Sequence, residues 1–305
     1  MSSVDNLQPD PSVISDILKP PFVQLPDPAR VFAKRAERLR GLAEGHNLAD
    51  YLRFLADITD AQIRVLQDLP EPAMPSADVI ARAKEHAMPP LDRNNFSSDV
   101  AFDATLERLI AAAADIKMPE AARGALDHLR KADKAAREIM IRNVLADSIP
   151  VEELAIHVLM ASALQVHFAR MAQRLDKDGL VPVGDGACPS CGAPPATSAV
   201  VGWPTAPGAR YCSCSLCGTL WNYVRSRCTV CGSTAKISFQ EVEGTGGEIK
   251  AETCGSCNSY VKVVYQQKNA ELDPIADDVA SLALDLLVRE LGFRRGGFNP
   301  FLLGY

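Results

Sequence analysis

The pentapeptide CPSCG at residues 188–192 is followed by CSLCG at 214–218, CTVCG at 228–232 and CGSCN at 254–258. These four stretches hold eight of the nine cysteines of the chain, and adding 40 to each cysteine number of the first two gives the last two. A C-x2-C pair is a metal knuckle, and two knuckles supply four thiolate ligands. The sequence therefore predicts two metal sites on a duplicated unit. The predicted ligands are Cys188, Cys191, Cys214 and Cys217, and then Cys228, Cys231, Cys254 and Cys257.

Each set of four cysteines lies in the pattern of a small β module. The 22 residues between its two knuckles are long enough for a hairpin that returns the second knuckle to the first. Proline and glycine mark the turn of the first hairpin, and three glycines mark that of the second. We predict strands near 198–203, 210–212 and 220–224, and again near 237–242, 249–253 and 260–264. This is a rubredoxin-like or zinc-ribbon-like plan, present twice.

Two other uses of paired cysteines compete with metal binding. Structural disulfides need an oxidising compartment, but the polar start MSSVDNLQPD lacks the apolar core of a signal peptide. We also find no run of about 18 apolar residues, so we predict a cytoplasmic protein without a membrane span. Redox-active pairs normally sit at a helix N-terminus in a βαβ setting, and nothing here provides one.

The metal itself is left open between zinc and iron. None of the five histidines lies near the cysteines, so both sites should be all-sulfur, which suits either ion. Pairing of knuckles within each copy is favoured, although a crossed arrangement also satisfies the spacing. We expect two metal ions, iron or zinc, one per site, in a structural or electron-storing role. The ninth cysteine, Cys212, is either a small half-buried side chain or a spare thiol that exchanges with a ligand.

The whole chain predicts an α+β fold of 305 residues with more than one domain. Residues 1–26 are proline-rich and form an extended lead-in, and 27–183 form an all-α domain whose first helix begins at Asp27-Pro28. The two metal modules occupy 184–225 and 226–268, and a C-terminal helix with a tail occupies 269–305. We expect the core of the helical domain to be separate from the modules, so that it stays folded when a metal is lost.

The C-terminal helix should begin at Asp273-Pro274 and bury one apolar stripe, which includes Val279, Leu286, Leu287 and Leu291. Its carboxylates lie off that stripe and should be solvated. The tail combines aromatic residues with arginines, and it either packs back onto the protein or anchors a partner. The partner-binding candidates are Arg294, Arg295, Asn299 and Phe301.

Charge argues against nucleic acid. The net charge is −6, and residues 188–257 hold five basic and four acidic side chains. Two divalent ions bound by eight thiolates would bring that module to about −3, whereas a nucleic-acid grip needs a basic face. We also find no glycine-rich phosphate loop and no histidine beside the cysteines to act as a base, so no catalytic constellation is predicted.

Several runs of residues resemble those of the formate dehydrogenase accessory protein family, FdhE. They are CPSCGAPP at 188–195, RYCSCSLCGTLW at 210–221, Arg225 and Arg227 before the Cys228 knuckle, Glu252 before Cys254, YVK at 260–262, DDVASLALD at 277–285 and NPFLL at 299–303. The resemblance is close from about residue 184 to the end and less specific in the helical half. Cys212 departs from the family pattern.

The resemblance implies a cytoplasmic, non-enzymatic maturation factor. Its partner would be the catalytic subunit of a respiratory formate dehydrogenase, which contains molybdopterin and an iron–sulfur cluster. The eight paired cysteines of this chain would be the metal ligands of a rubredoxin-like iron protein. Two alternatives stay open: an electron-transfer protein acting in redox control of maturation, and a nucleic-acid-binding zinc ribbon. The oligomeric state, including a homo-oligomer, is also open.

Overall fold

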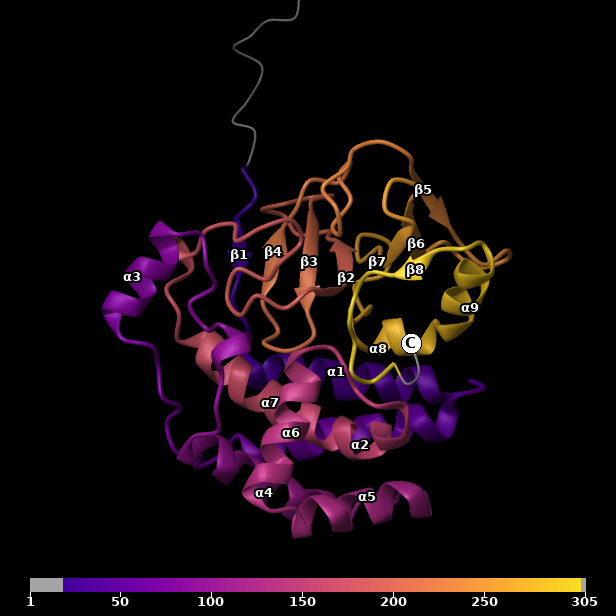
Figure 1. The fold of residues 1–305 in the computed structure, drawn as a ribbon. Coiled ribbons are helices and arrows are strands. Elements are labelled where there is room, and N and C mark those ends of the chain that lie inside the picture. Colours follow the sequence, from indigo (N-terminus) through magenta and orange to yellow (C-terminus); the bar gives the residue numbers. More distant parts are fainter. Residues whose placement is uncertain (1–18, 303–305) are drawn as a thin grey trace, which may run out of the picture.

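The computed structural model describes residues 19–302. A layer of helices from the first half of the chain lies against one side of a strand-rich half, as Figure 1 shows. The chain then returns to helix, and its last described residues lie back against the helical layer. The predicted α+β class, with helices first and a strand-rich region after them, is confirmed. Residues 1–18 of the predicted lead-in and 303–305 of the tail lie outside the described residues.

The helices of the first half begin close to where their caps predict. Asp27 caps the first helix by accepting a hydrogen bond from the Arg30 amide, and Ser76 caps the third by accepting one from Val79. The second helix begins at Ala49, and the Leu48 amide just before it donates a hydrogen bond to the His46 ring. These helices are α1 (Pro28–Ala43), α2 (Ala49–Val65), α3 (Ala77–Glu85), α4 (Val100–Ala113), α5 (Glu120–Lys131), α6 (Lys134–Leu145) and α7 (Leu154–Gln173).

Helix α7 is the centre of the helical layer, and it packs against α1, α2, α4, α5 and α6. By length and composition alone, Val151–Gln173 could span a membrane, but 83% of its most apolar window is buried inside the protein. A helix that is apolar on all sides is expected at the centre of a core. No membrane span was predicted, and one helix in the described part of the chain is long and apolar enough to be a candidate. Its burial is that of a core helix.

The two β modules form one continuous sheet. Its strand order is β1-β4-β3-β2-β7-β6-β5, with β8 also paired to β7. The parallel pair β2–β7 joins the modules, and β1, from the predicted lead-in, pairs with β4. The strands are β1 (Val23–Gln24), β2 (Pro195–Val200), β3 (Arg210–Cys214), β4 (Leu220–Asn222), β5 (Ile237–Gln240), β6 (Ile249–Cys254), β7 (Ser259–Val264) and β8 (Arg294–Arg295).

A buried ion pair also ties the two modules together. The Arg210 guanidinium of β3 forms an ion pair with the Glu252 carboxylate of β6, with one N–O distance of 2.9 Å and one hydrogen bond of 3.0 Å. Arg210 also donates from Nε to the Ser198 hydroxyl at 3.0 Å. Both charged side chains are almost fully buried. Because each module contributes one charge, separating the modules would leave both charges without a buried partner.

The prediction that the helical core is separate from the modules is wrong. One apolar cluster contains helical residues such as Phe102, Leu164 and Phe168 together with Cys188, Cys214 and Trp221 of the first module. The reason is that the first module packs against the helical layer, where Gln165 of α7 donates to the Ser215 carbonyl of the second knuckle at 2.8 Å. The first module and the helical layer therefore share a core.

The predicted orientation of the C-terminal helix is also wrong. It is divided by Ser281 into α8 (Ala276–Ala280) and α9 (Leu282–Glu290), and Asp277, Asp278 and Asp285 are buried. Three leucines that were expected to face the protein, Leu286, Leu287 and Leu291, are about half exposed. The carboxylates turn inward because buried cations face them.

Those cations form a neutral cluster with two of the carboxylates. Lys262 of β7 contacts both Asp278, at 3.0 Å, and Asp285. Arg295 of β8 donates to the same two carboxylates, at 2.6 Å each. Burial alone would raise the pKa of Asp278, but Arg295 and Lys262 outweigh it and hold that pKa below its ordinary value. This ion cluster of two cations and two anions links β7, β8, α8 and α9.

Further ion pairs link the C-terminal segment to the helical layer. Arg38 of α1 donates to the buried Asp277 carboxylate, at 2.7 to 3.2 Å, and Arg35 pairs with Asp273 at 3.4 Å. Tyr51 of α2 donates to the Phe301 carbonyl at 2.6 Å. The tail therefore closes the molecule by packing onto α1 and α2.

Removing one cation from the ion cluster should destabilise the protein strongly. We expect Lys262→Met to lower the free energy of unfolding by about 3–5 kcal/mol, because two buried carboxylates would then share one cation. The free energy of unfolding is measured by chemical denaturation, with circular dichroism as the signal. As a control, Arg53→Ala breaks only the exposed pair with Asp50 and should cost less than about 1 kcal/mol. Equal effects of the two variants would contradict the role given to the cluster.

Candidate metal centres

The structure gathers the eight paired cysteines into two clusters, one per copy. Cys188, Cys191, Cys214 and Cys217 form the first, and Cys228, Cys231, Cys254 and Cys257 form the second, with all sulfurs of a cluster within 4.8 Å of one another. Pairing of knuckles within each copy is thereby confirmed, and the crossed arrangement is not observed. That these sulfurs hold a metal remains a prediction.

Each knuckle is a tight turn that ends in the left-handed region of backbone space. The residue after its second cysteine has φ of +78° at Gly192, +75° at Gly218, +69° at Gly232 and +53° at Asn258. Glycine, and less often asparagine, adopts this conformation without a large steric cost. In three of the knuckles this residue's amide donates back to the carbonyl of the first cysteine, at 2.8 to 3.2 Å. The turn aims both sulfurs of a knuckle at one point.

The spacing of the sulfurs fits a tetrahedral metal. The distances are 3.6 Å for Cys188–Cys217, 3.5 Å for Cys191–Cys214, and 3.8 Å for both Cys228–Cys257 and Cys231–Cys254. A tetrahedron with metal–sulfur bonds of about 2.3 Å has sulfurs about 3.8 Å apart, whereas a disulfide needs about 2.05 Å. All nine cysteines lie in the described part of the chain, and all are free. Either zinc or iron suits four thiolates.

The two clusters differ sharply in burial. All four cysteines of the first cluster are buried, whereas Cys231 of the second is exposed and Cys257 is partly exposed. The first cluster is also held by hydroxyls: Thr219 Oγ1 lies 3.1 Å from Cys217 Sγ and 2.9 Å from Ser190 Oγ. Burial raises the pKa of Cys188 and Cys191 well above the ordinary value, so a metal that binds there displaces protons.

Cys212 belongs to neither cluster. Its side chain is fully buried on β3, where its backbone pairs with Trp221. Burial raises the pKa of its thiol to about 12. A buried, protonated thiol is a poor nucleophile. Of the two roles considered for this residue, a packed side chain agrees with the structure.

The four residues predicted to bind a partner do not form one surface. Asn299 and Phe301 are buried, and Arg295 lies in the ion cluster, so the structure gives these three internal contacts. Arg294 alone of the four is exposed. A role for these residues in partner binding stays a prediction.

Sequence reasoning missed the buried charges around the metal modules. Lys262 stands in a strand that is otherwise apolar, in the run YVKVV at 260–264. Asp278 and Asp285 are seven residues apart, a spacing that places both on one face of a helix. A single lysine in an apolar strand and two aspartates on one helix face together indicate that the strand and the helix pack against each other through a buried ion pair.

A helical layer joined to a strand-rich region with two four-cysteine clusters defines the class of this protein. Three family models match the chain: "FdhE, N-terminal" over residues 20–185, "FdhE, central domain" over 187–225 and "FdhE, C-terminal domain" over 226–302. The chain belongs to the FdhE family.

Similar proteins of that name cover nearly the whole chain. "Protein FdhE homolog" of Rhizobium meliloti (strain 1021) is 48% identical, over 99% of this chain and 100% of that protein. The protein of the same name from Proteus mirabilis (strain HI4320) is 35% identical, over 98% and 96%. The crystal structure of the FdhE protein from Pseudomonas aeruginosa superposes with a TM-score of 0.83 at 32% identity, covering 93% of this chain and 99% of that one. The resemblance to formate dehydrogenase accessory proteins is therefore confirmed at the level of the family.

The difference in burial predicts different rates of metal release. When zinc-loaded protein is mixed with a chromogenic chelator, we expect one equivalent to leave the second cluster quickly. The other should leave about tenfold or more slowly, because the buried cluster must open locally. Cys231→Ser should remove the fast phase only, and Cys191→Ser the slow phase only. Release of both equivalents at one rate would contradict the difference.

The shared core predicts unequal effects of removing each site. Cys188→Ser with Cys191→Ser should lower the free energy of unfolding by about 3 kcal/mol or more and reduce the helical signal, because polar groups would replace sulfurs inside the common core. Cys254→Ser with Cys257→Ser should disturb mainly the second module. Far-UV circular dichroism and thermal melts of both variants measure this. Full retention of the helical signal by the first variant would contradict the shared core.

Proposed function

We propose that this protein is a non-enzymatic maturation factor that binds the catalytic subunit of a respiratory formate dehydrogenase in the cytoplasm during assembly. The observation that carries the proposal is the match of all three FdhE family models, in order, along almost the whole chain. Relatives of that name cover the chain at up to 48% identity.

In this proposal the eight paired cysteines hold two metal ions, zinc or iron. The sulfur spacing and the left-handed turns support that assignment. The first ion would act as a permanent part of the core, because its ligands are buried and packed against the helical layer. The second would stabilise the outer module, whose only described strand contacts with the first are at β2–β7.

A second candidate function is electron transfer in redox control of maturation. The exposure of Cys231 favours it, because a metal near the surface can exchange electrons with a docked partner. Iron-loaded protein would then show a reversible potential assigned to the second cluster. If colourless zinc-loaded protein restores maturation fully, electron transfer is not required.

A capture experiment tests the main proposal. The protein is purified without oxygen, its metal content is measured, and it is mixed with a tagged formate dehydrogenase catalytic subunit of the same organism. We expect a stable complex with metal-loaded protein and weaker capture by the Cys188→Ser, Cys191→Ser variant, whose core is disturbed. The Arg53→Ala variant serves as a folded control and should be captured as well as the wild type. Absence of a complex with fully metal-loaded wild type would refute the proposal.

A further inference from the structure

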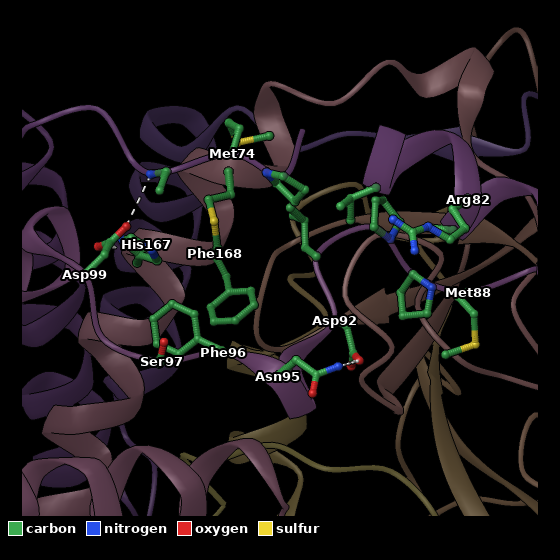
Figure 2. A pocket seen from close by; sticks show the side chains of 18 of the residues that line it. Met74, Arg82, Met88, Asp92, Asn95, Phe96, Ser97, Asp99, His167 and Phe168 are labelled. Carbon is green, nitrogen blue, oxygen red and sulfur yellow. Dashed lines mark hydrogen bonds and ion pairs between the residues drawn. The ribbon is translucent and has the colours of Figure 1, made fainter. Parts of the chain in front are cut away.

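A cavity of about 600 Å³ opens between α3, the segment that follows α3 and the C-terminal half of α7. Its size lies within the range of pockets that bind ligands. Much of the lining is apolar and adaptable, with three methionines and two phenylalanines. These residues are Met74, Met88, Phe96, Phe168 and Met171. Figure 2 shows Asp99 and His167 at one end and Arg82 and Met88 at the other.

Helix α3 faces this cavity with one side and has no buried residue. Val79, Arg82, Ala83 and His86 line the cavity, at the spacing of a single helix face. A nine-residue helix is not stable on its own and depends on contacts with its surroundings. The inner face of α3 thus lies across the cavity from α7, and Figure 1 shows α3 at the edge of the molecule.

His167 of α7 provides an independent sign of a ligand. Its side chain is fully buried, it lines the cavity, and neither ring nitrogen has a hydrogen-bond partner. Burial lowers its pKa to about 4, so the neutral ring offers one donor and one acceptor. The nearest carboxylate, Asp99, lies 3.9 Å away and accepts from the amides of Phe102 and Ala73. Unsatisfied buried nitrogens are costly.

One wall of the cavity is built on the first four-cysteine cluster. The Leu91 amide donates to the Ser190 carbonyl at 2.9 Å, and the Arg93 amide to the Cys191 carbonyl at 3.2 Å. Arg93 also makes two hydrogen bonds of 2.8 Å to Asp147. The cavity therefore has one side formed by α7 and by the segment that the knuckle holds in place. The opposite side is formed by α3, which has no buried residue.

We propose that this cavity binds an extended apolar segment of the partner polypeptide, with α3 closing over it. The proposal rests on the proposed function, since the segment belongs to the formate dehydrogenase catalytic subunit. Apolar side chains of the segment pack among the methionines and phenylalanines, and one peptide N–H and C=O pair with His167. Arg82 lies at the other end of the cavity, and it and His86, which follows one helical turn later, complement a flanking carboxylate.

Two tryptophan variants on opposite faces of α3 test the proposal. Ala83→Trp places an indole in the cavity, whereas Ala81→Trp places the same group on the outer face, which does not line it. Overlapping 15-residue peptides that tile the catalytic subunit are the probes. We expect the wild type and Ala81→Trp to bind the same peptide alike, and Ala83→Trp to bind it about tenfold or more weakly. Capture of the whole subunit should fall in the same order.

A third variant tests the role of His167. His167→Phe keeps the ring and removes the two unpartnered nitrogens, so we expect the melting temperature to rise by about 2–4 °C while peptide affinity falls about tenfold. A lower melting temperature would show that the nitrogens are already satisfied within the folded protein, and would overturn this part of the argument.

The outcomes separate this proposal from the proposed function. If the wild type captures the subunit but no peptide binds, or both tryptophan variants bind alike, the cavity proposal fails and the maturation role stands. If the wild type captures no subunit, the proposed function fails and the cavity proposal fails with it. A small molecule released at one equivalent from the denatured wild type, and absent from Ala83→Trp, would overturn the assignment of a peptide.

Discussion

The sulfurs of Cys188, Cys191, Cys214 and Cys217 converge inside an apolar core that the first β module shares with the helices. The rest of the structure depends on this convergence, because it fixes two separate chain turns against the helical half of the chain at once. One knuckle carries the wall of the cavity through its carbonyls, and the other accepts from Gln165. Local sulfur geometry thereby sets the position of a helix, a loop and a sheet relative to one another.

The second cluster repeats the geometry of the first in a different environment. Its knuckles have the same turns and nearly the same sulfur spacing, but no helical layer covers Cys231. The same cysteine spacing therefore produces one centre that belongs to the core and one that lies at the surface. Both copies keep the turn geometry, whereas their burial differs because the cysteines of the first copy share a core with the helical layer.

Local signals predicted much of the fold and the grouping of the cysteines, because caps, knuckles and alternating strands act over a few residues. Asp27 caps the helix that it precedes, and the four knuckles pair as the repeat predicts. The failures all involve pairing over long sequence distances. The face that α9 buries is set by Lys262 and Arg295, so the leucine stripe alone gave the wrong side. The cavity lies between α3 and α7, which are far apart in the sequence, and no short motif predicts that the two helices leave a space between them.

The ion pair between Arg210 and Glu252 shows how far the two copies have diverged. In the other copy, the positions related by the 40-residue repeat are Lys250 and Cys212. Lys250 pairs with Glu241 near the surface, and Cys212 lies buried among apolar side chains. The first copy thus supplies the buried cation and the second copy the buried anion that neutralises it. Deletion of either copy would leave a charged side chain in the interior without its partner, so neither copy can be removed without a compensating substitution in the other.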